Sequence, residues 1–312
     1  MIDRMFTAEV LERLGRSPLT PNLIDRLEVL TAHGPYPSDK VMAERVAWLR
    51  GRKALWDSYI ESASVCGLFD GAAGAELLSR LIGSDDENFR ASIAECSTCF
   101  YLANVCRLPV VAKPQGRGRK VLEMSAQLSD GPLNVEVKAP AVAEPTDFFM
   151  GDDSHVIETM LKKANNQFAE NDRNLLVIVP RLRTPVCHFR YQVVKALIGE
   201  FKIEMTMNTN TGEVVSPPKN KFFPDGSFVR PGKPDRSPAF TRVGGVMCIE
   251  ETMYVNGGHS RVRQYVLEQK AILIHNPYAK FPIVNDCWNC LPQFIRIGGD
   301  LMKWTDDYPP MT

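Results

Sequence analysis

The chain has 312 residues, enough to bury a sizeable core in one large or two ordinary domains. Its hydrophobic content of 44% and charged content of 24% are typical of a soluble globular protein. The 37 basic and 37 acidic residues cancel, so net charge neither indicates nor excludes a nucleic-acid partner. The longest apolar runs, such as 175–180, are too short to cross a bilayer, and the N-terminus does not resemble a secretory signal. We therefore expect a cytoplasmic protein with no membrane association.

Eight cysteines are too few for a disulfide scaffold in a chain of this length. Two pairs have CxxC spacing, at 96–99 and 287–290, and together they could form a zinc site. The first pair lies within a predicted helix and the second lies in a predicted loop. This placement favours buried or reduced thiols over a metal site.

The first part of the chain, residues 1–85, is predicted to be a helical N-terminal segment. Its stretches combine capping residues or proline starts with an apolar spacing near 3.6. A further helix is expected from Ser84 to about residue 108, ending before Pro109. Residues 86–312 are predicted to form a second domain with extended C-terminal strands and loops.

A β-hairpin is predicted over residues 121–138. After a short strand candidate at 109–113, the stretch 121–128 alternates between apolar and polar residues, "SDGP" turns the chain, and 131–138 returns. A helix over 152–171 and an apolar strand over 174–180 follow, and the lack of alternation in this strand indicates burial on both sheet faces. The order helix, hairpin, helix, strand predicts an α/β core.

Charged side chains gather on the polar face of this hairpin. Glu136 and Lys138 are two residues apart in a strand, so their side chains share one face, and Glu123 is on the facing strand. Two neighbouring carboxylates repel unless a cation lies between them, and oxygen ligands suit Mg²⁺ or Mn²⁺ rather than zinc. The preceding helix contributes Glu95, and the following helix contributes Gln167 on its inward side.

This set of residues resembles the PD-(D/E)XK, or restriction-endonuclease-like, phosphodiesterases. The likeness covers about residues 85–180 and lies in Glu95, Glu123, the "EVK" of 136–138 and Gln167. It implies a restriction-endonuclease-like core, with a mixed central sheet flanked by helices. A weaker likeness to stand-alone bacterial members lies in "VGGVMCIEE" and "HNPYAKFPI", and it implies no catalytic role.

The resemblance also implies a role for each position. Glu123 and Glu136 would bind the metal ion, with the Val137 carbonyl as a third ligand, and Glu95 would bind a second ion or its water. Lys138 would orient or deprotonate the attacking water and offset charge on the phosphorus. Gln167 would steady the lysine or the phosphate. A divalent ion is needed because a phosphodiester is anionic and resists attack, so its charge must be shielded and a water acidified.

The sequence departs from the family pattern in the first hairpin strand. The family usually has Pro-Asp there, whereas this chain has Leu122-Glu123, and the longer side chain of glutamate changes the geometry of the metal site. Asp130 in the "SDG" turn is the rival ligand, although Asp-Gly is also what a tight turn requires. Whether Glu123 or Asp130 completes the site is left open by the sequence.

A basic loop directly precedes the Glu123 strand. It contains Lys113, Arg117, Arg119 and Lys120, and at the mouth of the predicted site it would contact nucleic-acid phosphates.

The sequence thus predicts a Mg²⁺-dependent nuclease, with Mn²⁺ as the alternative ion. Its substrate would be DNA rather than RNA, in phage defence, DNA processing or a mobile element. The alternative is a nucleic-acid-binding or assembly subunit that keeps the nuclease fold with degenerate catalysis. The sequence leaves open whether the chain forms a homodimer or binds a regulatory partner protein. Some regulation is expected, because an ungated nuclease would endanger its host.

Overall fold

The computed structural model describes a large part of the chain and gives no placement for the first 54 residues. The described ranges are 55–83, 85–112, 122–140, 154–180, 189–204, 206–212, 214–215, 219–223, 226–228, 240–256, 264–283, 286–296 and 302–304. The predicted N-terminal segment 1–85 is therefore described only from residue 55, where a helix runs to residue 65. All four residues of the predicted basic loop, namely Lys113, Arg117, Arg119 and Lys120, lie outside the described residues.

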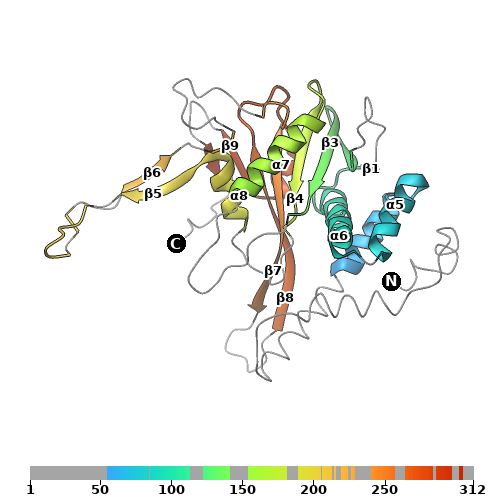
Figure 1. Ribbon diagram of the computed structural model, residues 1–312, viewed down its shortest axis with the longest axis horizontal. Coiled ribbons are helices and arrows are strands. Elements are labelled where there is room, and N and C mark those ends of the chain that lie inside the picture. Colours follow the sequence, from blue (N-terminus) through green and yellow to red (C-terminus); the bar gives the residue numbers. More distant parts are fainter. Residues whose placement is uncertain are drawn as a thin grey trace.

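An eight-stranded mixed sheet forms the centre of the described structure (Figure 1). Its spatial order is β1-β2-β3-β4-β7-β8-β9-β10, and β3, β4 and β7 are parallel neighbours. The strands are β1 Val110–Ala112, β2 Met124–Leu128, β3 Gly131–Lys138, β4 Arg173–Ile178, β7 Gly245–Asn256, β8 Gln264–His275, β9 Gln293–Arg296 and β10 Met302–Trp304. The predicted α/β class, a mixed sheet flanked by helices, is confirmed.

Helices cover both faces of the sheet, and each face has its own apolar core. On one face lie the helix 55–65, α5 Gly71–Ile82 and α6 Asp86–Phe100, which continues as a π-helix over Tyr101–Val105. On the other lie α7 Ser154–Gln167 and α8 Phe189–Ile198. Side chains of a central strand alternate between these cores, which explains why β4 is apolar throughout. None of the helices in the described part of the chain has the length and apolar character needed to cross a membrane.

The predicted hairpin is confirmed as β2 and β3, paired antiparallel from Met124 opposite Val135 to Leu128 opposite Gly131. Gly131 has a φ of 135°, a conformation that side chains rarely adopt, so the turn after Asp130 requires glycine. The first strand is shorter than predicted, because β2 begins at Met124 and Glu123 lies in a bend just before it. The bend also turns Leu122 to the α7–α8 core, whereas Met124 belongs to the α5–α6 core.

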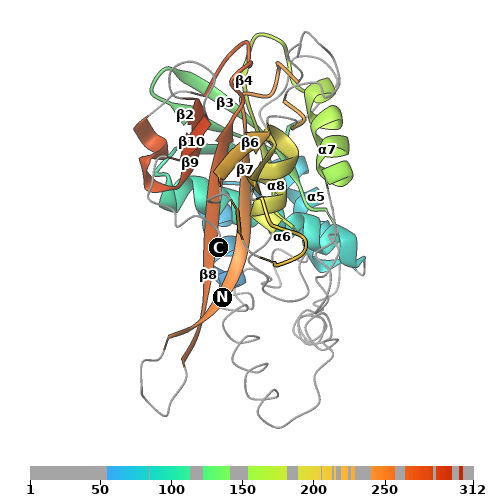
Figure 2. The same ribbon diagram turned by 90° about the vertical axis from the view of Figure 1, so that its left-hand side faces the viewer.

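One β-ribbon continues from the central sheet, and a second ribbon forms a sheet of its own. The pairing of β7 with β8 continues to Asn256 opposite Gln264, whereas β4 pairs with β7 only as far as Cys248. The outer half of this ribbon therefore runs past β4, as both views show (Figures 1 and 2). Strands β5 Glu200–Glu204 and β6 Lys219–Phe223 form a separate antiparallel pair. A short 3-10 helix, Asp286–Cys290, precedes β9.

Candidate active site

The predicted site lies at the C-terminal end of β3. Glu136 and Lys138 are in register with Leu176 and Ile178 of the parallel strand β4, and these two residues belong to the α7–α8 core. Both charged side chains therefore project from the same sheet face, as the alternation of the sequence predicts. The carboxyl ends of parallel strands are where open α/β sheets commonly bind ligands.

Glu136 is a fully buried carboxylate with an incomplete set of partners. Its side chain is 0% exposed, and its Oε1 accepts a hydrogen bond from Lys138 Nζ. Its Oε2 is buried and has no hydrogen-bond partner among the described residues. A buried carboxylate oxygen without a donor is costly, so it marks a position where a ligand or cation would be stabilising. Lys138 is about one-quarter exposed, so its ammonium group reaches both the carboxylate and solvent.

Glu123 lies across the end of the β2–β3 ladder. Because the ladder stops at Met124, the carboxylate of Glu123 takes the place of a strand carbonyl and accepts a 3.4 Å hydrogen bond from the Val137 backbone N–H. Burial, a hydrogen bond with the Glu136 carboxyl and the negative charge of Glu136 together raise the pKa of Glu123 to about 9, although the positive charge of Lys138 lowers it. The two carboxyl groups are thus close neighbours, as the sequence predicts.

Glu95 approaches the same place from the other sheet face. It lies on α6 and is 5% exposed, and its negative charge contributes to the raised pKa of Glu123. Its Oε1 accepts a 2.8 Å hydrogen bond from Arg80 Nη2 on α5. The structure therefore brings Glu95, Glu123, Glu136 and Lys138 to one rim of the sheet, with Arg80 as an additional cation.

Two carboxylate side chains at this rim are suitable ligands for a hard divalent cation. Glu123 and Glu136 would supply carboxylate oxygens as metal ligands. Oε2 of Glu136, which has no hydrogen-bond partner among the described residues, is available for this role. The described ranges contain no group of three or more Asp, Glu, His or Cys side chains that lie close enough together to hold a metal ion. Glu95, which is bonded to Arg80, lies near enough to raise the pKa of Glu123 but does not form a three-carboxylate cluster with Glu123 and Glu136 in the described ranges.

Gln167 is the last residue of α7 and lies away from Lys138. The helix connects two parallel strands, so it runs back along the sheet and ends beside the beginning of β4. Its Oε1 is buried and has no hydrogen-bond partner among the described residues. A role for Gln167 beside the lysine stays a prediction, and the topology places it toward the opposite end of β3.

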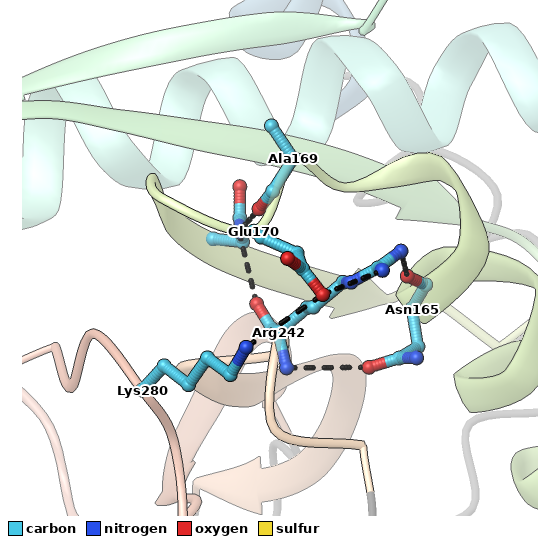
Figure 3. A network of polar contacts seen from close by, with 6 residues as sticks. Asn165, Ala169, Glu170, Arg242 and Lys280 are labelled. Atoms are coloured by element: carbon cyan, nitrogen blue, oxygen red, sulfur yellow. Dashed lines mark hydrogen bonds and ion pairs between the residues drawn. The ribbon is translucent and has the colours of Figure 1, made fainter.

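The contacts of the last turn of α7 confirm this placement. Asn165 accepts hydrogen bonds from Arg242 through its side-chain and backbone oxygens, at 3.3 and 3.4 Å. Arg242 Nη2 also lies 2.8 Å from Glu170 Oε1, which Lys280 approaches at 3.6 Å (Figure 3). This polar network ties the end of α7 to the loop before β7.

The rival ligand Asp130 is also at the far end of β3. Its Oδ2 lies 2.7 Å from Arg173 Nη2, and its backbone carbonyl accepts a 3.0 Å hydrogen bond from Arg173 Nη1. Asp130 therefore has a local partner at the turn, while Glu123 lies beside Glu136. This geometry favours Glu123 as the second carboxylate of the site.

The cysteines of the first CxxC pair, Cys96 and Cys99, are buried in the core beneath α6, and burial raises the pKa of both thiols. Cys290 of the second pair is exposed. Protonated, buried thiols are poor metal ligands, which agrees with the expectation of reduced cysteines.

A further buried carboxylate, Glu250 on β7, is absent from the sequence-based prediction. It is 1% exposed, and its Oε1 accepts a hydrogen bond from the backbone N–H of Arg190 in the first turn of α8. Burial raises the pKa of Glu250 to about 7, while Arg190 lowers it. Because Cys248 is in register with Ile178, Glu250 lies just past the end of β4. No local motif could reveal it, since the pairing of β4 with β7 spans 70 residues.

No family model and no curated protein matches the chain. Among solved structures, the chain is similar to SfsA of Pyrococcus furiosus in complex with Ca²⁺. That likeness has 16% sequence identity and a TM-score of 0.16, and it covers 41% of this chain and 59% of SfsA. A TM-score this low does not define a common fold, and the chain matches less than two thirds of the length of SfsA.

Proposed function

We propose that the chain is a metal-dependent phosphodiesterase of the PD-(D/E)XK type that cleaves nucleic acid, DNA rather than RNA. The observation that carries the proposal is the buried Glu136, whose one oxygen binds Lys138 while the other has no partner in the described structure. Beside it lies a second carboxyl group, Glu123. A carboxylate pair next to a lysine at the carboxyl end of parallel strands supports hydrolysis of a phosphodiester better than a purely structural role.

Each side chain has a distinct task in this proposal. Glu123 and Glu136 would hold one Mg²⁺ or Mn²⁺, which when bound would shield the phosphate charge and lower the pKa of water. Lys138, fixed by Glu136 and partly open to solvent, offsets the negative charge that develops on the phosphate. Glu95 adds negative charge behind the pair and favours cation binding.

The proposal is tested by cleavage and metal binding measured together. Plasmid, linear duplex DNA, single-stranded DNA and RNA are incubated with the purified chain and Mg²⁺, Mn²⁺ or EDTA. Mn²⁺ binding is measured separately by isothermal titration calorimetry. We expect cleavage that requires the ion and falls at least about a hundredfold in Glu136→Gln and Lys138→Met. Only Glu136→Gln should also lose Mn²⁺ binding.

The chain offers a matched control pair. Glu170 and Lys280 form an ion pair of 3.6 Å at the far end of the sheet, so Glu170→Gln and Lys280→Met make the same chemical changes there. These controls should cut as the wild type does. Cleavage that persists in EDTA, or that survives Glu136→Gln, contradicts the proposed mechanism.

A second candidate function is supported by Glu123. Burial and its hydrogen bond with Glu136 raise its pKa to about 9, so the two carboxyl groups share a proton at neutral pH while the site is free, and a protonated carboxyl is a weak metal ligand. This observation favours a nucleic-acid-binding or assembly subunit with degenerate catalysis. Filter binding in the same experiment separates the two functions, since the subunit would bind DNA without cutting it in any ion.

A further inference from the structure

Arg80 lies outside the stretch that resembles the nuclease family, yet it contacts the candidate site. It is in the last turn of α5, and its Nη2 donates a 2.8 Å hydrogen bond to Glu95 Oε1. The helix containing Arg80 packs against α6 through a face that includes Leu77, Leu78 and Leu81. Arg80 is therefore anchored on a helix that is itself fixed to the helix bearing Glu95.

Several features hold the Arg80 guanidinium in place. Its side chain is 23% exposed, and its Nε lies 4.0 Å from Oε1 of the exposed Glu76, one turn earlier on α5, which is an ion-pair contact and not a hydrogen bond. A cation at the C-terminal end of a helix is also favoured by the helix dipole. Because α5 packs firmly against α6, the backbone position of Arg80 is fixed relative to Glu95, and the 2.8 Å hydrogen bond can orient the Glu95 carboxylate.

Glu95 needs such a partner. Its side chain is 7% exposed and lies near the carboxyl of Glu123, so it is a buried acidic group beside another acidic group. Lys138 is already paired with Glu136, and Arg80 is the guanidinium bonded to Glu95. Each of these two carboxylates thus has its own cationic partner.

We propose that Arg80 is a positioning residue of the site, which holds the Glu95 carboxylate toward the Glu123–Glu136 pair and thereby strengthens binding of a divalent cation. This inference rests on the proposed function, because it assigns a role within the same site. It extends the site to α5, a helix beyond the region of family likeness. Outer partners of this kind commonly change metal affinity by about tenfold or more when they are removed.

The affinity for a divalent ion tests this role, because electrostatic repulsion and positioning predict opposite changes in affinity when Arg80 is removed. Removing a positive charge near a cation site strengthens cation binding if the charge acts only by repulsion. If Arg80 acts by positioning Glu95, Arg80→Met should instead weaken Mn²⁺ binding by about tenfold. Isothermal titration calorimetry on the full chain measures both directions.

Three further variants assign the effect to Glu95. In a Glu95→Gln background, Arg80→Met should cause no further weakening, because the group it positions is gone. Arg80→Lys keeps the charge and one donor and should stay within about threefold of the wild type. Arg173→Met removes an arginine from a 2.7 Å ion pair at the far end of β3 and should leave Mn²⁺ affinity unchanged.

The outcomes separate this inference from the proposed function. Mn²⁺ binding that is present in the wild type but unchanged or tighter in Arg80→Met overturns the role of Arg80 alone. Equal weakening by Arg80→Met with and without Glu95→Gln also overturns it. If the wild-type chain binds no Mn²⁺ at all, the proposed function fails and the role of Arg80 fails with it. Circular dichroism melts of each variant identify any that fail to fold, and Arg80→Lys then provides the decisive comparison.

Discussion

One face of β3 carries polar side chains at both ends of the strand. The hydrogen bonding of these side chains differs between the two ends. At the beginning of the strand, Asn134 Nδ2 donates to Asn174 Oδ1 and Asp172 Oδ2, both at 3.1 Å. Asn174 is 0% exposed, and its Nδ2 lies within 3.0 Å of the carbonyl oxygens of Ala169, Asp172 and Arg242. The side-chain amide nitrogens of both Asn134 and Asn174 therefore have partners.

The other end of the same face holds charges without a full set of partners. The described residues supply no N–H or hydroxyl donor to Glu136 Oε2, and burial together with the neighbouring Glu136 carboxyl raises the pKa of Glu123. Polar groups that are fully hydrogen-bonded stabilise a unique fold, whereas incompletely paired charges store free energy that a ligand can release. The contrast distinguishes a fully hydrogen-bonded end of the strand from the end where we propose the active site, and four substitutions can test it.

The largest effect is expected from Glu136→Gln, which should separate activity from stability. Cleavage should fall by about a hundredfold or more, which corresponds to roughly 3 kcal/mol of transition-state stabilisation. The free energy of unfolding should stay unchanged or rise by about 1 kcal/mol, because the buried charge is removed while the partly exposed Lys138 can turn to solvent. Urea unfolding of the two proteins measures this. A loss of stability that matches the loss of activity would assign Glu136 a structural role.

At the structural end, Asn174→Ala should have the opposite profile. It removes the side chain that joins β4 to Asn134 and to the loop at Arg242, and it leaves several buried groups without partners. We expect the free energy of unfolding to fall by roughly 3 kcal/mol, as is usual for breaking a buried hydrogen-bond network. Cleavage measured well below the melting temperature should stay close to that of the wild type. A selective loss of cleavage in a stably folded variant would contradict the division between the two ends.

The third prediction concerns Glu250, which lies past the end of β4, on the side of the proposed active site. Its pKa is raised to about 7 in the folded chain from an ordinary value of 4.5, chiefly by burial. Between these two pH values the folded state binds more protons than the unfolded state, so stability falls as pH rises through the window. The fall is up to roughly 3 kcal/mol, since one pKa unit corresponds to about 1.4 kcal/mol.

The pH dependence is measured by urea unfolding at pH 4.5, 5.5, 6.5 and 7.5. Glu250→Gln cannot ionise, so the stability difference between the variant and the wild type should grow in favour of the variant as pH rises toward 7 and then level off. A difference that is constant across this range would show that folding does not raise the pKa of Glu250. The result decides whether incomplete pairing of charges extends from β3 to β7.

The sequence predicts much of this arrangement, because it is encoded locally. Alternation in the hairpin places Glu136 and Lys138 on one face, and the apolar spacing of α6 and α7 predicts both helices. Register across the hairpin places Glu123 opposite Glu136, although the bend before β2 is not visible in the alternation.

What the sequence does not reveal depends on distant contacts. The partner of Glu95 is on another helix, α5, and the partners of Glu250 are on α8. Asn174 resembles any polar residue at the start of a strand, since its carbonyl partner at Arg242 is 68 residues away. The role predicted for Gln167 rests on its inward position on α7, but that position does not indicate which end of the sheet the last turn reaches. Only the parallel pairing of β3 with β4 determines that end.

The smallest effect is expected from Asp130→Asn, at the turn that precedes β3. Asp130 is the alternative metal ligand in the sequence, but its Oδ2 pairs with Arg173 at 2.7 Å and its side chain is 45% exposed. Exposed ion pairs contribute less than about 1 kcal/mol, so stability should change little. Cleavage and Mn²⁺ affinity should equal those of the wild type, whereas Glu123→Gln should weaken both. If Asp130→Asn lost Mn²⁺ binding and Glu123→Gln did not, the metal ligands would lie at the turn, and the two ends of β3 would exchange roles.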